Sequence, residues 1–357
     1  MNSRERVIAA VTGKKPDRVP FDLSWGFSEP YQKLFFEKTG QTDYMGYFGV
    51  DNDFANGIGS NHPHDYSAYF GKRTKDSMFS FGEWGIGYQK TPDSGHFSHV
   101  IPPLKNAVSL NQILDYPLPD VDADYRLDAI PGIVDNIHQK TQAASAPLAC
   151  TLFETAWQIR GFEELIMDLL DENGISECLI DRITAIREKQ VNAYVKAGVD
   201  IVMFGDDIGM QTGMMLSPNL WRSVFKPRMA KLIETARAIR PGIPVFYHSD
   251  GDIREVIPDL IEIGVTVLNP IQPECMDPAE IKKQYGDKLS FWGTVSVQKT
   301  LPFGTPEDVK KEVKLRMETI GKDGGFLIGP AHMIEPEVPW ENLIAFIEAI
   351  EEFGYYQ

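Results

Sequence analysis

The sequence has few cysteines, few cations and no long apolar run, and each shortage excludes a class of protein. Three cysteines, Cys150, Cys178 and Cys275, are scattered over 357 residues with no CxxC pair, which favours a reducing compartment over a disulfide scaffold. Lys and Arg number 35 against 51 Asp and Glu, and the net charge of −16 disfavours nucleic acid and membrane surfaces as partners. No apolar run could span a bilayer, and the charged N-terminus lacks a signal-peptide core. We therefore expect a cytoplasmic protein.

Several catalytic motifs are also missing. The sequence contains no GxSxG elbow, Walker loop or GxGxxG turn, so serine hydrolases, P-loop enzymes and Rossmann dehydrogenases lack their defining parts. It contains no HExxH, which leaves a mixed His/Asp/Glu metal site open.

The second half instead alternates apolar strands with amphipathic helices. Strands are expected at 198–209, 244–247, 265–273, 288–296 and 324–332. Helices are expected at 218–240, 253–264, 277–286, 305–321 and 339–354. Earlier in the chain, 17–25 and 146–154 are predicted strands, 161–197 is helical, and 26–120 is expected to hold one further strand and long loops. About eight strands in such alternation predict an α/β fold, a (β/α)8 TIM barrel forming a single domain over 1–357.

One strand ends in an unusual way. The segment PVFYHSDGDI, 244–253, passes from four apolar or aromatic residues directly to His248, Ser249, Asp250 and Gly251. Asp250 could simply cap the helix that starts near Ile253, or the pair could be part of a catalytic edge.

Other predicted strands end in the same way. The polar residues at these ends are Asp22, Glu154, Asp206, Asp207, His248, Asp250, Asn269, Gln272, Thr294, Gln298, His332 and Glu335. Each alone is more often a cap or a satisfied edge group than a catalyst. Because the strand ends of a barrel converge, six segments with this feature together favour one shared site. His248 and Asp250 point to the same side of their strand and are candidate metal ligands.

With these residues identified, the chain resembles the uroporphyrinogen decarboxylase superfamily, and within it the corrinoid-dependent methyltransferases. The segments that carry the resemblance are 246–309, from FYHSDGDIREV onward, GPAHMIEPEVPWENL at 329–343, GDDIGMQTGMMLSPNLWRSVFKPR at 205–228 and RERVIAAVTGKKPDRVPFD at 4–22. They cover nearly the whole chain. The resemblance implies a (β/α)8 barrel with its pocket at the carboxyl ends of the strands.

The sequence departs from two patterns of this superfamily. Where the decarboxylases carry an arginine-rich RQAGR segment that grips propionates, this chain has FDLSWGFSEPY, 21–31, without arginine. Where the zinc methyltransferases carry His-x-Cys and a later Cys, it has His248-Ser249-Asp250 and the segment 329–332, GPAH. A zinc or other metal ion would therefore meet nitrogen and oxygen ligands here, from His248 and Asp250, completed by Glu154 or Asp206.

The resemblance then implies transfer of a methyl group from a methoxylated aromatic, or a similar small donor, to the cobalt of a corrinoid (cobalamin) carried by a partner protein. Catalysis is expected from His248, Asp250, Glu154, Asp206 and Asp207, and substrate contacts from Asp22, Trp25, Trp157, Tyr247, Asn269, Gln272 and His332. Trp25, Phe153, Trp157, Tyr247 and Trp292 could wall the pocket, although plain packing is expected for at least half of them.

Two alternatives remain. A decarboxylase of a smaller acid would need a cation, for which Arg160 and Arg222 are the nearest candidates. A non-catalytic corrinoid-binding module would bind cobalamin without turnover.

Overall fold

A parallel sheet forms the centre of the computed structural model, which describes residues 1–91 and 97–356. Its seven strands are β1 (Asn52–Phe54), β5 (Ala143–Ala149), β6 (Ile201–Gly205), β9 (Val245–His248), β10 (Val267–Asn269), β11 (Ser290–Val295) and β12 (Phe326–Pro330). They lie in this order across the sheet, and every neighbouring pair is parallel. The chain therefore has the predicted α/β architecture, and β1 is the one further strand expected in 26–120.

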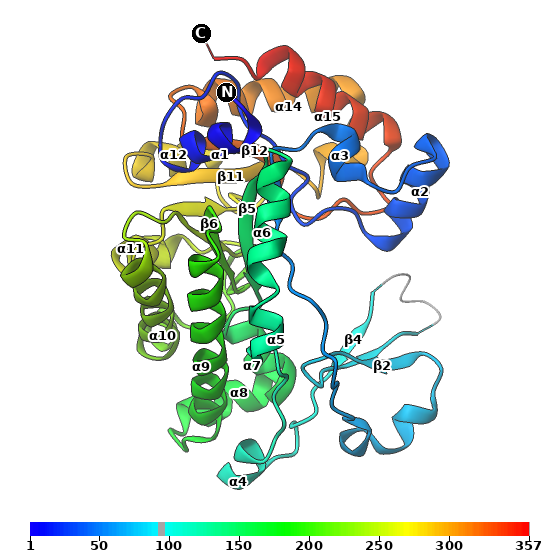
Figure 1. The fold of residues 1–357 in the computed structure, drawn as a ribbon, viewed down its shortest axis with the longest axis vertical. Coiled ribbons are helices and arrows are strands. Elements are labelled where there is room, and N and C mark those ends of the chain that lie inside the picture. The colour runs from blue at the N-terminus through cyan, green and yellow to red at the C-terminus, as the bar shows by residue number, and fades with distance from the viewer. Residues whose placement is uncertain (92–96, 357) are drawn as a thin grey trace.

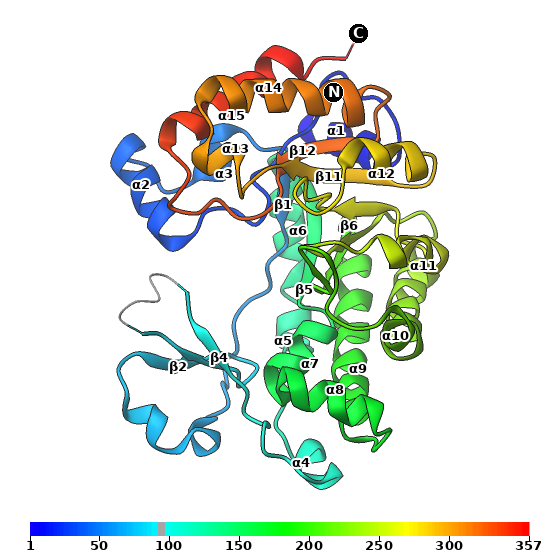
Figure 2. The ribbon, with the colours of Figure 1, turned by 180° about the vertical axis from the view of Figure 1, so that it is seen from behind.

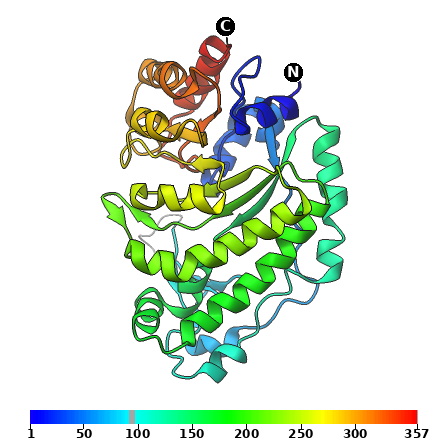
Figure 3. The ribbon, with the colours of Figure 1, turned by 90° about the vertical axis from the view of Figure 1, so that its left-hand side faces the viewer.

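Helices surround this sheet, and all of the longer described ones except the first lack residues in its inner core. The longer ones are α1 (Ser3–Val11), α2 (Glu29–Thr39), α6 (Ile130–Gln139), α7 (Phe153–Arg160), α8 (Phe162–Leu170), α9 (Ile175–Lys196), α10 (Pro218–Ile239), α12 (Pro278–Tyr285), α14 (Pro306–Arg316) and α15 (Trp340–Phe353). The shorter ones are α3 (Tyr44–Phe48), α4 (Leu110–Leu114), α5 (Asp124–Leu127), α11 (Ile257–Ile263) and α13 (Thr300–Phe303). The long helices α9 and α10 lie side by side outside the strands (Figure 3). Among the described helices, none is long and apolar enough to cross a membrane.

Two hydrophobic cores lie on the two faces of the sheet. The larger core fills the space between the strands and the surrounding helices. The smaller core holds inward residues from successive strands, such as Met203, Phe246, Trp292 and Leu327, and is completed by Val7 and Val11 of α1. Because side chains alternate along a strand, Phe246 joins the inner core while Val245 and Tyr247 join the outer one. The next residue, His248, accordingly lies on the inner side.

The segment predicted as the first strand, 17–25, is not a regular strand. It forms a single parallel bridge, Phe21 with Ile328 of β12, because Pro20 has no N–H to donate to a ladder. It nevertheless contacts both edges of the sheet. The Ile328 N–H donates to Pro20 O at 3.0 Å, and the N–H of Asp51, just before β1, donates to Phe21 O at 3.0 Å.

A second, antiparallel sheet lies apart from the parallel one (Figures 1 and 2). Its strands are β2 (Phe79–Phe81), β3 (Gly87–Gln89) and β4 (His99–Ile101). The turn between β2 and β3 is fixed to the main body, since Tyr116 donates its hydroxyl to Trp84 O and Arg126 pairs with Glu83. This sheet was not predicted, because its strands have only three residues each.

Candidate active site

The site lies where β6, β9 and β12 end and α7 begins. Glu154 was predicted at a strand end but stands in the first turn of α7, five residues after the end of β5. Its Oε2 accepts the N–H of Asp207 at 3.0 Å, and Asp207 Oδ1 lies 3.4 Å from His248 Nε2. The structure thus brings these predicted residues together at one end of the sheet.

His248 is held by a fixed neighbour. Its Nδ1 lies 2.6 Å from Asn269 Oδ1, and Asn269 Nδ2 donates to Trp292 O at 2.9 Å. Because the second bond fixes which side-chain atom of Asn269 is the oxygen, His248 Nδ1 must carry the proton. The Nε2 lone pair of the neutral ring then points away from Asn269 and can meet a metal ion or a proton. Asn269 was predicted to contact substrate, but it positions His248 instead.

Three side chains near this Nε2 could hold a metal ion. One ligand atom each from His248, Asp250 and His332 lie within 4.8 Å of one another. Asp250 is not the helix cap that the plainer interpretation required, because Asp252 Oδ1 accepts the Arg254 N–H at 3.1 Å. Asp250 Oδ1 is instead buried without a hydrogen-bond partner. An orphaned carboxylate oxygen beside two imidazoles fits a divalent cation.

Turn geometry explains why Asp250 stays in place. Gly251 has φ +83°, and a Cβ there would lie 2.4 Å from the backbone of Gly209. Gly209 begins the small hairpin of β7 (Gly209–Met210) and β8 (Gly213–Met214) that follows β6. The Met210 carbonyl accepts the Asp252 N–H at 2.8 Å, so the hairpin is bonded to the turn that bears Asp250. This hairpin was not predicted from the sequence, since only Gly209 and Gly213 hint at it.

Burial raises the pKa of three carboxyl groups near His248. The pKa of Glu154 rises to about 8, first through burial and then through the charges of Asp207 and Asp206. Burial also raises the pKa of Asp206 to about 7, although the N–H groups of Glu154 and Leu152 oppose the shift. Burial raises the pKa of Asp250 as well, against the opposing influence of His248 and His332. At neutral pH, Glu154 therefore retains a proton that it can donate.

Aromatic rings form one wall of the site. Trp25 meets the His248 ring edge to face with centroids 5.0 Å apart, and it stacks on Phe54 at 5.7 Å. Phe54 was not predicted, because it is the last residue of a three-residue strand in the weakly patterned region. Asp22 supports this wall, since it accepts the Ser24 N–H and the Trp292 Nε1–H, both at 2.9 Å. Burial raises the pKa of Asp22 to about 7. Asp22 thus bonds the residue before Trp25 to the indole of Trp292.

Three predicted aromatic residues lie in the hydrophobic packing outside the sheet. Tyr247 faces the outer core because strand alternation puts it opposite His248. Phe153 packs edge to face on Phe162 and Phe225, and Trp157 on Phe162. The substrate contacts expected of Tyr247 and Trp157 are therefore replaced by packing between β9 or α7 and neighbouring helices.

The remaining predicted residues serve the loops. Gln272 Oε1 accepts the Gly251 N–H at 3.1 Å, and Gln298 Oε1 accepts from Gln211 of the β7–β8 hairpin at 3.1 Å. Thr294 is buried with φ +84°, a strained conformation for a β-branched residue. Glu335 is partly buried in the loop after His332.

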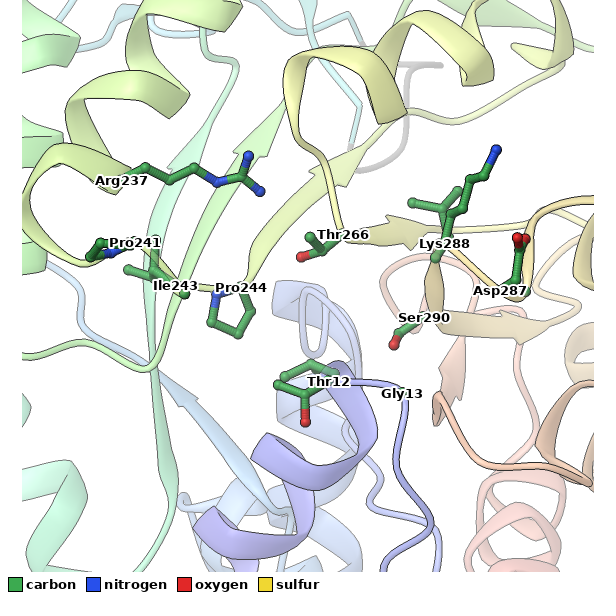
Figure 4. Close-up of a pocket in the computed structure, with 14 residues that line it drawn as sticks. Thr12, Gly13, Arg237, Pro241, Ile243, Pro244, Thr266, Asp287, Lys288 and Ser290 are labelled. Atoms are coloured by element: carbon green, nitrogen blue, oxygen red, sulfur yellow. The ribbon is translucent and has the colours of Figure 1, made fainter.

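A separate cavity of about 270 Å³ lies at the opposite ends of the strands (Figure 4). Residues of α1 and the starts of β9, β10 and β11 line it. Only the Arg237 guanidinium points inward, whereas the Lys288 ammonium and the Asp287 carboxylate point away (Figure 4). Thr266 Oγ1 accepts the Val245 N–H at 2.9 Å. The converging polar groups of a catalytic site are thus found at the His248 end instead.

Loss of the Asn269 amide should weaken metal binding without unfolding the protein. In Asn269→Ala, the His248 ring can rotate and exchange its ring proton, so affinity for a divalent cation should fall about 10- to 100-fold. Calorimetric titration of the metal-free protein with Zn²⁺ measures this, with the exposed Asn219→Ala of α10 as control. Unchanged affinity in Asn269→Ala would show that His248 needs no orienting partner.

Comparison with known proteins agrees with this geometry. The profile of the uroporphyrinogen decarboxylase (URO-D) family matches residues 84–353, which is well over half of the chain. The chain belongs to the uroporphyrinogen decarboxylase family. This confirms the resemblance drawn from the strand ends.

Relatives of this URO-D family chain include both methyltransferases and decarboxylases. It is 25% identical over 185 residues to the methylcobamide:CoM methyltransferase MtaA of Methanosarcina barkeri, covering 52% of this chain and 51% of that protein. It thus spans about half the length of this curated relative. It is 22% identical over 260 residues to the uroporphyrinogen decarboxylase of Coxiella burnetii strain RSA 493, covering 71% and 69% of the two chains.

A solved structure supports the fold of this URO-D family chain. It superposes on a methyltransferase from Methanosarcina mazei with a TM-score of 0.69, 18% identity and 99% of both chains covered. At this identity the match establishes the fold alone.

Proposed function

We propose that the protein transfers a methyl group from a methoxylated aromatic, or a similar small donor, to the cobalt of a corrinoid held by a partner protein. The observation that carries this proposal is the juxtaposition of three potential metal ligands, His248, Asp250 and His332, with the protonated carboxyl of Glu154. Such a set suits a reaction whose difficulty is a poor leaving group. The similarity to MtaA, by its name a methylcobamide methyltransferase, supports the same class.

The residues present fit a divalent cation. His248 Nε2 is left free by the bond of Nδ1 to Asn269, and Asp250 Oδ1 is buried and unpartnered. Two imidazoles and one carboxylate leave coordination positions open, and both ligand types are accepted by zinc. A bound cation would supply Lewis-acid polarisation of the donor's oxygen. His332 replaces Glu154 and Asp206 as the third ligand, because its ligand atom clusters with those of His248 and Asp250 whereas Asp206 caps the start of α7.

Glu154 supplies the proton in this scheme. The O–CH3 bond of the donor breaks, the methyl group passes to Co(I), and the bonding electron pair stays on the oxygen. That oxygen takes the proton of Glu154, so a phenol departs instead of a phenolate. Trp25 and Phe54 orient the aromatic ring of the donor beside His248.

We propose further that the strands close into a single-domain (β/α)8 barrel over 1–357. On a flat sheet, β9 and β12 would lie about 14 Å apart, three strand spacings. The ligand atoms of His248 and His332, which follow these strands, nevertheless lie within 4.8 Å. Strong curvature is therefore required, and Pro20–Asp22, bonded to both edges of the sheet, supports closure as the eighth strand. The thiol state of all three cysteines supports the expected cytoplasmic location.

The decarboxylase alternative loses its candidate cations. Arg160 pairs with Asp168 at 2.7 Å, and Arg222 pairs with Asp259 at 3.0 Å between α10 and α11. Neither is available to hold a substrate carboxylate. A corrinoid-binding module without turnover remains the other alternative.

One assay separates the three functions. Purified protein is incubated with Co(I) cobalamin and a panel of aryl methyl ethers, and methylcobalamin and phenol are followed by absorbance and chromatography. The proposal predicts both products in equal amounts. Release of CO2 from aryl carboxylates without methylcobalamin would favour the decarboxylase, and cobalamin binding without either product would favour the binding module.

A further inference from the structure

The carboxylates around His248 have no lysine or arginine partner among the described residues. In the described parts of the chain, Glu154, Asp206, Asp207 and Asp250 form ion pairs with neither lysine nor arginine, and one pair is formed with a histidine, Asp207 with His248. Throughout the part of the chain that the structure describes, these groups thus lack the lysine or arginine partners that carboxylates have elsewhere on the protein.

The arginine that lies behind this site, Arg187, is not free to bind a ligand. Arg187 is 6% exposed, and its nitrogens donate to the carbonyl oxygens of Thr151 and Cys150 at 3.2 and 2.9 Å. It also donates to Gln190 Oε1 at 3.0 Å, and Trp84 covers its face at 5.0 Å. Arg187 therefore holds the backbone just after β5. Its guanidinium is not available to an anionic substrate.

Asp207 is the carboxylate that a substrate would meet first. Its side chain is 36% exposed, whereas His248 and Asp206 are buried. It accepts the Asp250 N–H at 2.8 Å and faces His248 Nε2 at 3.4 Å, and both contacts use Oδ1. Oδ2 is left to face a ligand, on a residue that adjoins the proposed metal ligands.

We propose that Asp207 determines specificity by charge, selecting methyl donors that carry an ammonium group beside the methyl-bearing atom and rejecting those that carry a carboxylate there. The inference rests on the proposed methyl transfer for the position of the donor. An ammonium at that place pairs with the carboxylate of Asp207. A carboxylate there meets a like charge, and in the metal-free protein no lysine or arginine compensates it.

A matched series of aryl methyl ethers tests this. The probes are ortho-methoxybenzylamine, ortho-methoxybenzyl alcohol and ortho-methoxybenzoate, which differ only in the charge next to the ether. Calorimetry measures their binding to the metal-free protein with the native sequence, and to the metal-free variants Asp207→Asn and Asp287→Asn. The last variant removes the same charge at the opposite ends of the strands, beside the cavity of Figure 4.

In the native protein the affinity should be highest for the amine, intermediate for the alcohol and lowest for the benzoate. The affinities for the amine and the benzoate should differ roughly 10- to 100-fold. Asp207→Asn keeps the acceptor for the Asp250 N–H and should reduce the range of the three affinities to within about 3-fold. Asp287→Asn should keep the native range of affinities. The inference is overturned if benzoate binds as well as the amine, if the order survives in Asp207→Asn, or if none of the three binds. A charge order without methyl transfer would instead sink the proposed function and leave the selectivity standing.

Discussion

His248→Ala is expected to lower methyl transfer about 10²–10⁴-fold, the range for losing a group that assists departure of the leaving oxygen. The substitution removes the Nε2 that lies between Asp207 and the proposed metal, and it leaves Asn269 Oδ1 without its donor. The initial rate of methylcobalamin formation from Co(I) cobalamin and an aryl methyl ether measures the effect.

The fold should survive this change, because the lost hydrogen bond costs only about 1–3 kcal/mol of unfolding free energy. The exposed His62→Ala serves as the matched control and should transfer methyl groups at the native rate. Ethers of the most acidic phenols should lose least in His248→Ala, since their oxygen needs the least help to leave. An unfolded variant, or full turnover of every ether, would make His248 a structural residue only.

Glu154→Gln is expected to lower methyl transfer about 10²–10³-fold and to abolish the alkaline limb of its pH profile. The native group acts in its protonated form, and burial raises its pKa to about 8. Activity should therefore be full on the acid side of that pKa and fall about tenfold for each pH unit above it. Initial rates measured across this range for the native protein and Glu154→Gln test the assignment.

Cys150→Ser offers a control beside Glu154, because it replaces a neighbouring thiol without removing the carboxyl. It should keep the alkaline limb. A limb that persists unchanged in Glu154→Gln would assign the proton to another group, and a native rate that rises with pH would contradict a general acid altogether.

The second half of the fold was predictable because its local signals agree with one another. The helix expected at 305–321 begins as foreseen with Thr305 as N-cap and Pro306 in the first turn, and runs as α14 to Arg316 before a π-helical turn, Met317–Gly321. The strand expected at 288–296 is β11, Ser290–Val295. There, hydrophobic period and capping residues point to the same structure.

The first half was less predictable because contacts distant in sequence determine it. Pro20 prevents a regular ladder, so 17–25 is ordered by bonds to β12 and to Asp51 and not by a strand of its own. The strand expected at 146–154 begins and ends earlier, as Ala143–Ala149, so that Glu154 comes to lie on α7. Strands of three residues, such as β2 and β3, are too short to show an alternating hydrophobic pattern in the sequence.

Site membership was predictable, but the roles were not. Position after a strand identified His248, Asp250 and His332, yet His332 was expected to touch substrate. Strands β9 and β12 are not neighbours in the sheet, so only its curvature brings His332 beside Asp250. The structural contacts of Asn269 and Tyr247 could likewise not be read from the sequence, because hydrogen-bond partners and strand faces decide them. Their contact with substrate stays a prediction.

The most direct test of the account follows the methyl carbon itself. An aryl methyl ether labelled isotopically in its methoxy carbon is mixed with Co(I) cobalamin and the protein, and the labelled carbon is observed by nuclear magnetic resonance. We predict that the label appears on cobalt with the native protein. With His248→Ala the rate of label transfer should be at least about 10²-fold lower, so that the label stays on the ether. A label that never leaves oxygen with the native protein, over a panel of neutral and cationic ethers, would contradict methyl transfer at this site.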